Sequence, residues 1–349
     1  MLRRYYQSWL TTCHFVKLRF RRQPFLFYAF AVSLTIVVVI FWMYLKMTPR
    51  PPPGLILDKE IHDMFLGLKK PTYRPLRPIP LIIPQIHVKN LPPIIVSAHQ
   101  TTVKAEENFF KFLQNKDIKC NNDMRLGHPH DGGWNVCMSP PLGFGDNCLV
   151  YSFGIGNDWQ FEDAVSKIYG CRVLAYDPSM DVADHNRSNL ITFKRLGIGP
   201  KNEVTPAGWK VKTFGTFLKD EGHENTIINY LKFDIEYSEW RVLESLFKER
   251  SLKNVKQIGF EAHSKELFQV SKLDMPTGKE EFLKMYTTLR RLENLNFRKF
   301  NYRLNPFGEY RSKHSNKIQS CCYELHYVNM NMVRSNETII HDKDSELFH

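Results

Sequence analysis

Three acidic residues, Asp234, Glu236 and Glu239, follow one another at positions i, i+2 and i+5. They span the end of an expected strand and the start of an amphipathic helix. Carboxylates that converge at such a point repel one another unless one is protonated, paired with a base or bound to a metal ion. The spacing therefore indicates either a carboxylate with a raised pKa that acts as a general base, or a site for a divalent cation.

Plainer interpretations of the same residues remain open. Glu239 would stabilise a helix N-terminus, and Glu236 would be solvated. His263 is a further candidate for a general base, although a histidine at a strand end also serves as a structural residue with satisfied hydrogen bonds. We take Asp234, Glu236 and His263 as the candidate catalytic residues and assign no residue as a metal ligand.

A glycine turn is the second chemical feature. The apolar run 149–153 ends at Gly154, and Gly156 and Asp158 follow before residues recur at helical spacing. A second strand, 172–176, ends directly at Asp177, which is 21 residues after Gly156. This spacing is typical of a nucleoside-binding βαβ unit, in which glycines let the backbone approach the ligand and an acid bonds the ribose hydroxyls. Gly154, Gly156, Asp158 and Asp177 are therefore the candidate cofactor-binding residues, with Asp158 also placed to cap the helix.

The elements that must position these residues alternate between strand and helix from about residue 148. Such alternation predicts an α/β fold with a parallel sheet. The expected globular domain covers residues 98–335 and is followed by a polar tail at 336–349.

The N-terminal part of the chain has a different character. Residues 25–45 contain no charge, and as a helix they would be about 31 Å long, enough to cross a bilayer. Bases without acids precede this run, which predicts a cytosolic tail at 1–24, a transmembrane signal-anchor helix at 25–45 and the rest of the chain in the lumen. A cleaved signal peptide is the alternative, but the run ends in aromatic residues rather than in a cleavage site.

The net charge of +12 is explained largely by this N-terminal segment. Residues 1–46 contain seven bases and no acid, so the remaining 303 residues carry only +5. This small excess gives no indication of a nucleic-acid partner. The expected partners are the lipid bilayer, through residues 25–45, and an unknown acceptor substrate.

Proline, cysteine and sequons support the same layout. Eleven of the twenty prolines lie between residues 48 and 97, which predicts a Pro-rich stalk at 46–97. Six cysteines follow the anchor, and in an oxidising lumen they allow up to three disulfides with fifteen connectivities. Asn186 and Asn336 begin N-x-S/T sequons. A single-pass type II membrane protein of the Golgi or endoplasmic reticulum is expected.

Six segments in order carry a resemblance to a known family. They resemble S-adenosylmethionine-dependent methyltransferases of the methyltransferase-like protein 24 type, and more distantly the FkbM type. The segments are YSFGIGND (151–158), VLAYDPSM (173–180), ITFKRLGIGP (191–200), YLKFDIEYSEW (230–240), IGFEAH (258–263) and CYELHYVN (322–329).

The resemblance implies a class I methyltransferase fold, a Rossmann-like seven-stranded sheet that is parallel except for its last strand. Gly154 and Gly156 would face S-adenosylmethionine, and Asp177 would bind its ribose. Two positions depart from the family pattern. Ser152 replaces an acid two residues before the first glycine, and Tyr237 replaces the hallmark FkbM glycine, which puts a ring near the expected substrate pocket.

The sequence thus predicts a lumenal methyltransferase that uses S-adenosylmethionine, with a divalent cation as an additional cofactor hypothesis. A methyltransferase fold that only binds ligands is the alternative. A glycosyltransferase is disfavoured because the single D-x-D lies in the polar tail at 342–344. A sulfotransferase or kinase is disfavoured because the chain has no G-x-x-x-x-G-K-[ST] loop.

Overall fold

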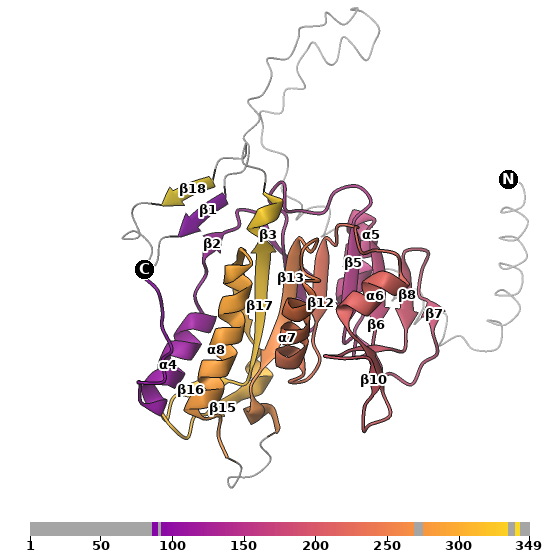
Figure 1. Cartoon of the computed structure of the whole chain (residues 1–349). Helices are drawn as coiled ribbons and strands as arrows, with labels where there is room; N and C mark the ends of the chain where they lie inside the picture. Colours follow the sequence, from indigo (N-terminus) through magenta and orange to yellow (C-terminus); the bar gives the residue numbers. More distant parts are fainter. Residues whose placement is uncertain (1–85, 90–91, 269–274, 334–338, 343–349) are drawn as a thin grey trace, which may run out of the picture. The chain divides into compact units, whose positions relative to one another are not determined.

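The computed structural model describes residues 86–89, 92–268, 275–333 and 339–342 (Figure 1). Chain contacts divide the protein into Met1–Ile79 and Pro80–His349, and all described residues belong to the second unit. The expected anchor at 25–45, most of the stalk and Asn336 lie outside the described residues. Within the described residues, no helix is both long enough and apolar enough to cross a membrane.

A mostly parallel sheet of eight strands forms the centre of the fold, in the order β14-β17-β13-β12-β5-β6-β8-β7. The strands in chain order are β5 (Leu149–Phe153), β6 (Arg172–Tyr176), β7 (His185–Asn186), β8 (Ile191–Lys194), β12 (Tyr230–Phe233), β13 (Gln257–His263), β14 (Phe297–Leu304) and β17 (Cys322–Asn329). β17 runs antiparallel to both neighbours, β13 and β14. The predicted α/β class is confirmed, whereas the expected count of seven strands is short by one.

The additional strand, β7, is two residues long and pairs antiparallel with β8 at the sheet edge. Nothing in its sequence has the length or the alternation of a strand, and it exists because the chain returns along an open edge. It contains Asn186, whose exposed position leaves this sequon accessible.

Helices cover both faces of the sheet (Figure 1). Four of them pack in one large core with one face, and α5 packs with a hairpin on the other. The helices are α4 (Thr102–Leu113), α5 (Gln160–Tyr169), α6 (Phe214–Asp220), α7 (Glu239–Glu249) and α8 (Lys279–Asn294), with short 3-10 turns at η2 (Lys265–Phe268), η3 (Pro306–Gly308) and η4 (Met330–Met332). Strands such as β5 are therefore buried on both faces, which explains their continuous apolar sequence.

Smaller strand groups complete the fold. β9 (Gly197–Ile198), β10 (Glu203–Val204) and β11 (Lys210–Lys212) form one sheet, and β1 (Ile86–Lys89), β2 (Ile118–Lys119) and β18 (Ile339–Asp342) form another. β3 (Asp123–Leu126) pairs with β4 (Trp134–Cys137), and β15 (Glu309–Arg311) pairs with β16 (Ile318–Ser320). β1 and the buried Val96 lie within the range predicted as a stalk.

The six cysteines of this unit form three disulfides. Cys148 and Cys171 join the residues that precede β5 and β6. Cys120 pairs with Cys137, and the neighbours Cys321 and Cys322 pair with each other. The structure thus selects one pairing from the fifteen that the sequence allows.

Candidate functional site

A cavity of about 850 Å³ lies where β5, β6 and β12 end. Parallel strands gather their carboxyl ends at one edge, and this edge is where ligands bind in such sheets. All four predicted cofactor residues line the cavity, as do the predicted catalytic residues Asp234 and Glu236. The structure therefore brings together the two features that the sequence showed 80 residues apart.

The glycine turn forms one wall of this cavity. Gly154 has a φ of +78°, and a Cβ there would overlap the backbone carbonyl oxygen of Asp234. Gly156 has a φ of +55°, and a Cβ there would meet no atom within 4 Å. Both positions favour glycine because of their backbone conformation. Gly154 is needed for packing within the protein, whereas Gly156 leaves open space for a ligand.

Asp177 holds this turn in place. Its Oδ2 accepts hydrogen bonds from the backbone amides of Ile155 at 2.8 Å and Gly156 at 2.9 Å. Its Oδ1 accepts from the backbone amide and the hydroxyl of Ser179. Burial by itself would raise the pKa of Asp177, but these hydrogen bonds outweigh burial and lower it. The carboxylate thus orders the loop, and a ribose hydroxyl would have to share its oxygens.

Asp158 lies next in the same wall. Its Oδ1 accepts a hydrogen bond from the backbone amide of Gln160, the first residue of α5, at 3.0 Å. The N-cap of α5 is therefore Trp159 rather than the predicted Asp158, although the Asp158 carboxylate still accepts from the first helical amide. A Cβ at Gly132 would overlap the Asp158 carboxylate, so the loop before β4 closes directly over this acid.

A buried ion pair next to the glycine turn was not predicted from the sequence. Lys232 in β12 donates to the carbonyl oxygen of Gly154 at 2.8 Å and to Oε1 of Glu162 at 3.3 Å. Ser152 donates to the same Glu162 oxygen at 2.6 Å. Ser152, which replaces the family acid, thus binds a buried carboxylate from α5. The signal was a lysine inside the apolar strand YLKF.

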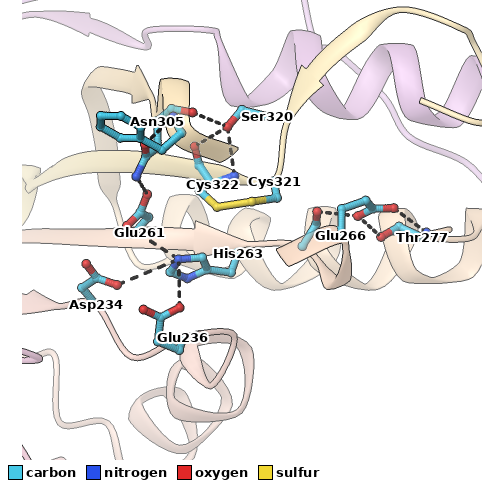
Figure 2. Close-up of a disulfide and its surroundings, with 12 residues drawn as sticks. Asp234, Glu236, Glu261, His263, Glu266, Thr277, Asn305, Ser320, Cys321 and Cys322 are labelled. Carbon is cyan, nitrogen blue, oxygen red and sulfur yellow. Dashed lines mark hydrogen bonds and ion pairs between the residues drawn. A yellow bond between two sulfur atoms is a disulfide. The ribbon is translucent and has the colours of Figure 1, made fainter. Parts of the chain in front are cut away.

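The acidic cluster centres on His263, with Asp234, Glu236 and Glu261 around its ring (Figure 2). Nδ1 of His263 is 3.1 Å from Oε1 of Glu239. Nε2 is 3.6 Å from Oε2 of Glu261, 3.9 Å from Oε2 of Glu236 and 4.0 Å from Oδ1 of Asp234. Asp234 and Glu236 line the cavity, and the other three are buried behind them.

The electrostatics of the cluster are strongly coupled. Burial raises the pKa values of Asp234, Glu236 and Glu261, and the charge of His263 opposes that rise. Burial would lower the pKa of His263, but its hydrogen bond to Glu239 and the surrounding carboxylates raise it to about 9. Without another ligand the ring is charged at neutral pH. Of the predicted catalytic residues, Asp234 and Glu236 are therefore better placed than His263 to accept a proton.

Glu239 does more than stabilise the N-terminus of a helix. It is the first residue of α7 and is fully buried, and its Oε1 also accepts from the backbone amide of Ile235. Its carboxylate therefore fixes both the loop after β12 and the ring of His263. The inward direction of Glu239 was not predicted.

The loop after β12 has an unusual backbone. Glu236 and Tyr237 have φ values of +52° and +73°, a region that costs a residue with a side chain about 1–2 kcal/mol. Glycine adopts a positive φ without this cost, which explains why the FkbM type has a glycine at the position of Tyr237. The ring of Tyr237 packs against the large core and is absent from the residues that line the described cavity. It therefore does not shape this cavity.

Two further walls complete the cavity. Trp209, between β10 and β11, lines the cavity and is 43% exposed. On the other side, the loop of residues 127–133 is held by Arg125, which donates to the backbone carbonyl of His128 and forms two bonds with Glu324 of β17. Residues 131, 132 and 134 line the cavity, so this loop borders the site.

Comparison with known proteins agrees with the geometry of the site. The family described as "Methyltransferase domain" matches residues 62–329. "Probable methyltransferase-like protein 24" of Homo sapiens is 29% identical over 238 residues, covering 63% of this chain and 63% of that protein. The Rattus norvegicus protein of the same description is 28% identical over 240 residues, covering 63% of this chain and 64% of that protein. The chain thus aligns with less than two thirds of the length of either relative.

Proposed function

Because the chain belongs to the methyltransferase domain family, we propose that it binds S-adenosylmethionine in the cavity at the carboxyl ends of β5, β6 and β12 and methylates an oxygen or nitrogen acceptor. The observation that carries the proposal is the glycine turn with open space at Gly156, held by Asp177 at the end of the neighbouring strand. Acids also dominate the charged lining, which suits a cofactor with a positively charged sulfonium.

S-adenosylmethionine, when bound, supplies a methyl group on a sulfonium sulfur for in-line displacement. The work of the protein is then to hold the acceptor in line, exclude water and take up a proton. Asp234 and Glu236 are the acids of the cluster that line the cavity, so they are placed to accept the proton of a hydroxyl or amine. Asp158 and Asp177, which also line the cavity, would contact the cofactor.

Calorimetric titration of S-adenosylmethionine into the purified full-length chain tests this proposal. We expect saturable heat from the natural protein and binding at least about tenfold weaker in Gly156→Ala, because the methyl group would enter the ligand space. Gly222→Ala is the matched control, since Gly222 also has a positive φ of +67°, and its Cβ also meets no atom within 4 Å. Gly222 follows α6 and is not among the described cavity residues.

The two possible failures of this test have different meanings. No heat from the natural chain would contradict S-adenosylmethionine binding. Equal loss of binding in Gly156→Ala and Gly222→Ala would contradict the placement of the cofactor, because backbone strain alone would then explain the loss.

We also propose that the protein is a single-pass type II membrane protein whose methyltransferase domain lies in the lumen of the Golgi or endoplasmic reticulum. The charge-free run at 25–45 and the bases that precede it support this topology. Glycosidase treatment of the expressed protein is expected to lower its mass, and Asn186→Gln with Asn336→Gln should abolish the shift. A natural protein whose mass does not change would count against lumenal placement.

A further inference from the structure

The orientation of the His263 ring is fixed from behind. Oε1 of the fully buried Glu239 accepts from Nδ1 of His263 and from the backbone amide of Ile235. A carboxylate accepts hydrogen bonds, so Nδ1 carries a hydrogen and Nε2 faces the other way. A histidine with one nitrogen bonded to a carboxylate and the other directed outward is the arrangement that orients metal ligands in proteins.

Three carboxylate oxygens surround Nε2 on that side, as Figure 2 shows for Asp234, Glu236 and Glu261. They lie 3.6–4.0 Å from Nε2. Atoms that each bind a shared ion at about 2.1 Å are about 3.0 Å apart when adjacent and about 4.2 Å apart when opposite. The observed separations fall within this range, although they exceed hydrogen-bond length.

Unpartnered atoms in the cluster provide independent support. Oδ1 of Asp234 and Oε2 of Glu239 are buried and have no hydrogen-bond partner within the described residues. Nε2 of His263, a side chain only 3% exposed, has carboxylates as its ion-pair partners, at 3.6–4.0 Å. Buried polar atoms are rarely left unpaired, because desolvation costs about 1–3 kcal/mol each.

The charge balance points the same way. Within the part of the chain that the structure describes, His263 is the ion-pair partner of all four carboxylates. One imidazole does not balance four carboxylates, and the nearby Lys232 is paired with Glu162. Four ionised carboxylates carry a charge of −4, and a divalent cation bound to the neutral imidazole would reduce it to −2.

We propose that Asp234, Glu236, Glu261 and His263 bind one divalent transition-metal ion at the edge of the cavity, with Glu239 orienting His263 from behind. Three carboxylates and one imidazole suit Mn²⁺, since carboxylates favour hard ions and imidazole favours transition metals. Cys322 also lies close to Glu261 and His263, but its sulfur is bonded to Cys321 and offers no thiolate. Glu236 and Asp234 border the cavity, which gives the ion a path from solvent.

Manganese binding to the full-length chain tests the proposal. The protein is treated with a chelator, dialysed and titrated with MnCl₂, and free Mn²⁺ is followed by electron paramagnetic resonance. We expect one Mn²⁺ per chain, and binding at least about tenfold weaker in Glu236→Gln. The Glu236 side chain is 72% exposed, so this variant should fold, and an unchanged melting temperature verifies that it does. Asp234→Asn is the second variant.

Glu203→Gln is the matched control, because Glu203 lines the same cavity from β10 and lies outside the cluster. Its affinity for Mn²⁺ should remain within about twofold. The proposal is overturned if the natural chain binds no Mn²⁺ stoichiometrically, or if Glu236→Gln binds as tightly as the natural chain.

The metal inference and the proposed function fail separately. S-adenosylmethionine binding is measured on the chelator-treated protein, and Mn²⁺ binding is measured without S-adenosylmethionine. Mn²⁺ binding without cofactor binding would keep the metal site and reject the methyltransferase proposal. Cofactor binding without Mn²⁺ binding would keep the methyltransferase proposal and reject the metal site.

Discussion

The ammonium group of Lys232 lies 2.8 Å from the backbone carbonyl oxygen of Gly154 and thereby ties β12 to the glycine turn of β5. The same ammonium pairs with Glu162 of α5, and both side chains are at most 5% exposed. A single buried charge thus connects the strand that leads to the acidic cluster with the turn and the helix on the cofactor side. Lys232 therefore fixes the glycine turn relative to the strand that carries the acidic cluster.

Removing one partner of this ion pair should be costly, and removing both should cost much less. Lys232→Met leaves Glu162 buried and uncompensated, so we expect a loss of about 3–5 kcal/mol in unfolding free energy. Lys232→Met with Glu162→Gln removes both charges and should recover part of that loss. Urea unfolding of the full-length chain measures each variant. Additive losses in the double variant would contradict coupling between the two residues.

The sequence predicted the sheet well where hydrophobic pattern and spacing were decisive. The runs 149–153 and 172–176 are strands with those limits, because strands buried on both faces read as continuous apolar segments. β7 escaped prediction, since it forms through a sheet edge rather than through its own sequence. Pairing of the cysteines also depends on the tertiary fold, as Cys148 and Cys171 meet only when β5 and β6 lie side by side.

A methyl group at Gly154 should disrupt the turn even without any ligand. Its Cβ would overlap the carbonyl oxygen of Asp234, and the φ of +78° adds strain. We expect Gly154→Ala to lower the unfolding free energy by about 3 kcal/mol or more. Gly156→Ala should lower the unfolding free energy by only about 1–2 kcal/mol. The backbone strain is similar, but the new Cβ would contact no other atom. Thermal unfolding of both variants without ligand tests this, and equal losses would contradict it.

Because of Asp177, the unfolding free energy of the protein should depend on pH. The hydrogen bonds of Asp177 lower its pKa in the folded state, so its contribution is fully present above the unfolded value of about 3.9 and is lost as pH falls through the folded value. At pH 7, Asp177→Asn should cost about 2–3 kcal/mol, since an amide nitrogen would face backbone donors. The gap between the natural chain and the variant should narrow below about pH 4.

Melting temperatures between pH 3 and pH 7 measure this gap. Asp181→Asn is the control, because the Asp181 side chain is 96% exposed and its ion pair should contribute little. A gap between the natural chain and Asp177→Asn that stays constant with pH would show that the charge of Asp177 is not what holds the turn.

The site could be predicted only in part. Asp177, Gly154 and Asp234 follow strands directly, so their meeting at one edge follows from the parallel sheet. Glu261 lies in the segment 258–263 that contributes to the family resemblance, but it was not among the candidate site residues, and Glu162 and Arg125 had no signal of their own. Their roles depend on which way a buried side chain points, and that is decided by packing between distant segments such as β3 and β17.

Arg125 should stabilise the loop that borders the cavity and should do so through Glu324. Its guanidinium forms two bonds with that carboxylate, at 2.7 and 2.9 Å, and also donates to backbone carbonyls of the loop. Burial by itself would raise the pKa of Glu324, but the neighbouring His326 and the hydrogen bonds from Arg125 lower it. Arg125→Gln leaves this carboxylate buried with less charge compensation, so we expect a loss of about 3–5 kcal/mol. Arg195→Gln breaks the exposed ion pair with Asp181 and should cost less than about 1 kcal/mol.

The pH dependence separates a charge effect from simple loss of packing. Glu324 contributes stability above its unfolded pKa and loses it as pH falls through its lowered folded pKa. Without Arg125 the folded pKa rises, so the stability difference between the natural chain and Arg125→Gln should be largest near pH 7 and smaller near pH 3. Arg195→Gln should show almost no such trend. If Arg125→Gln loses the same free energy at both pH values, Arg125 acts through packing rather than through its charge.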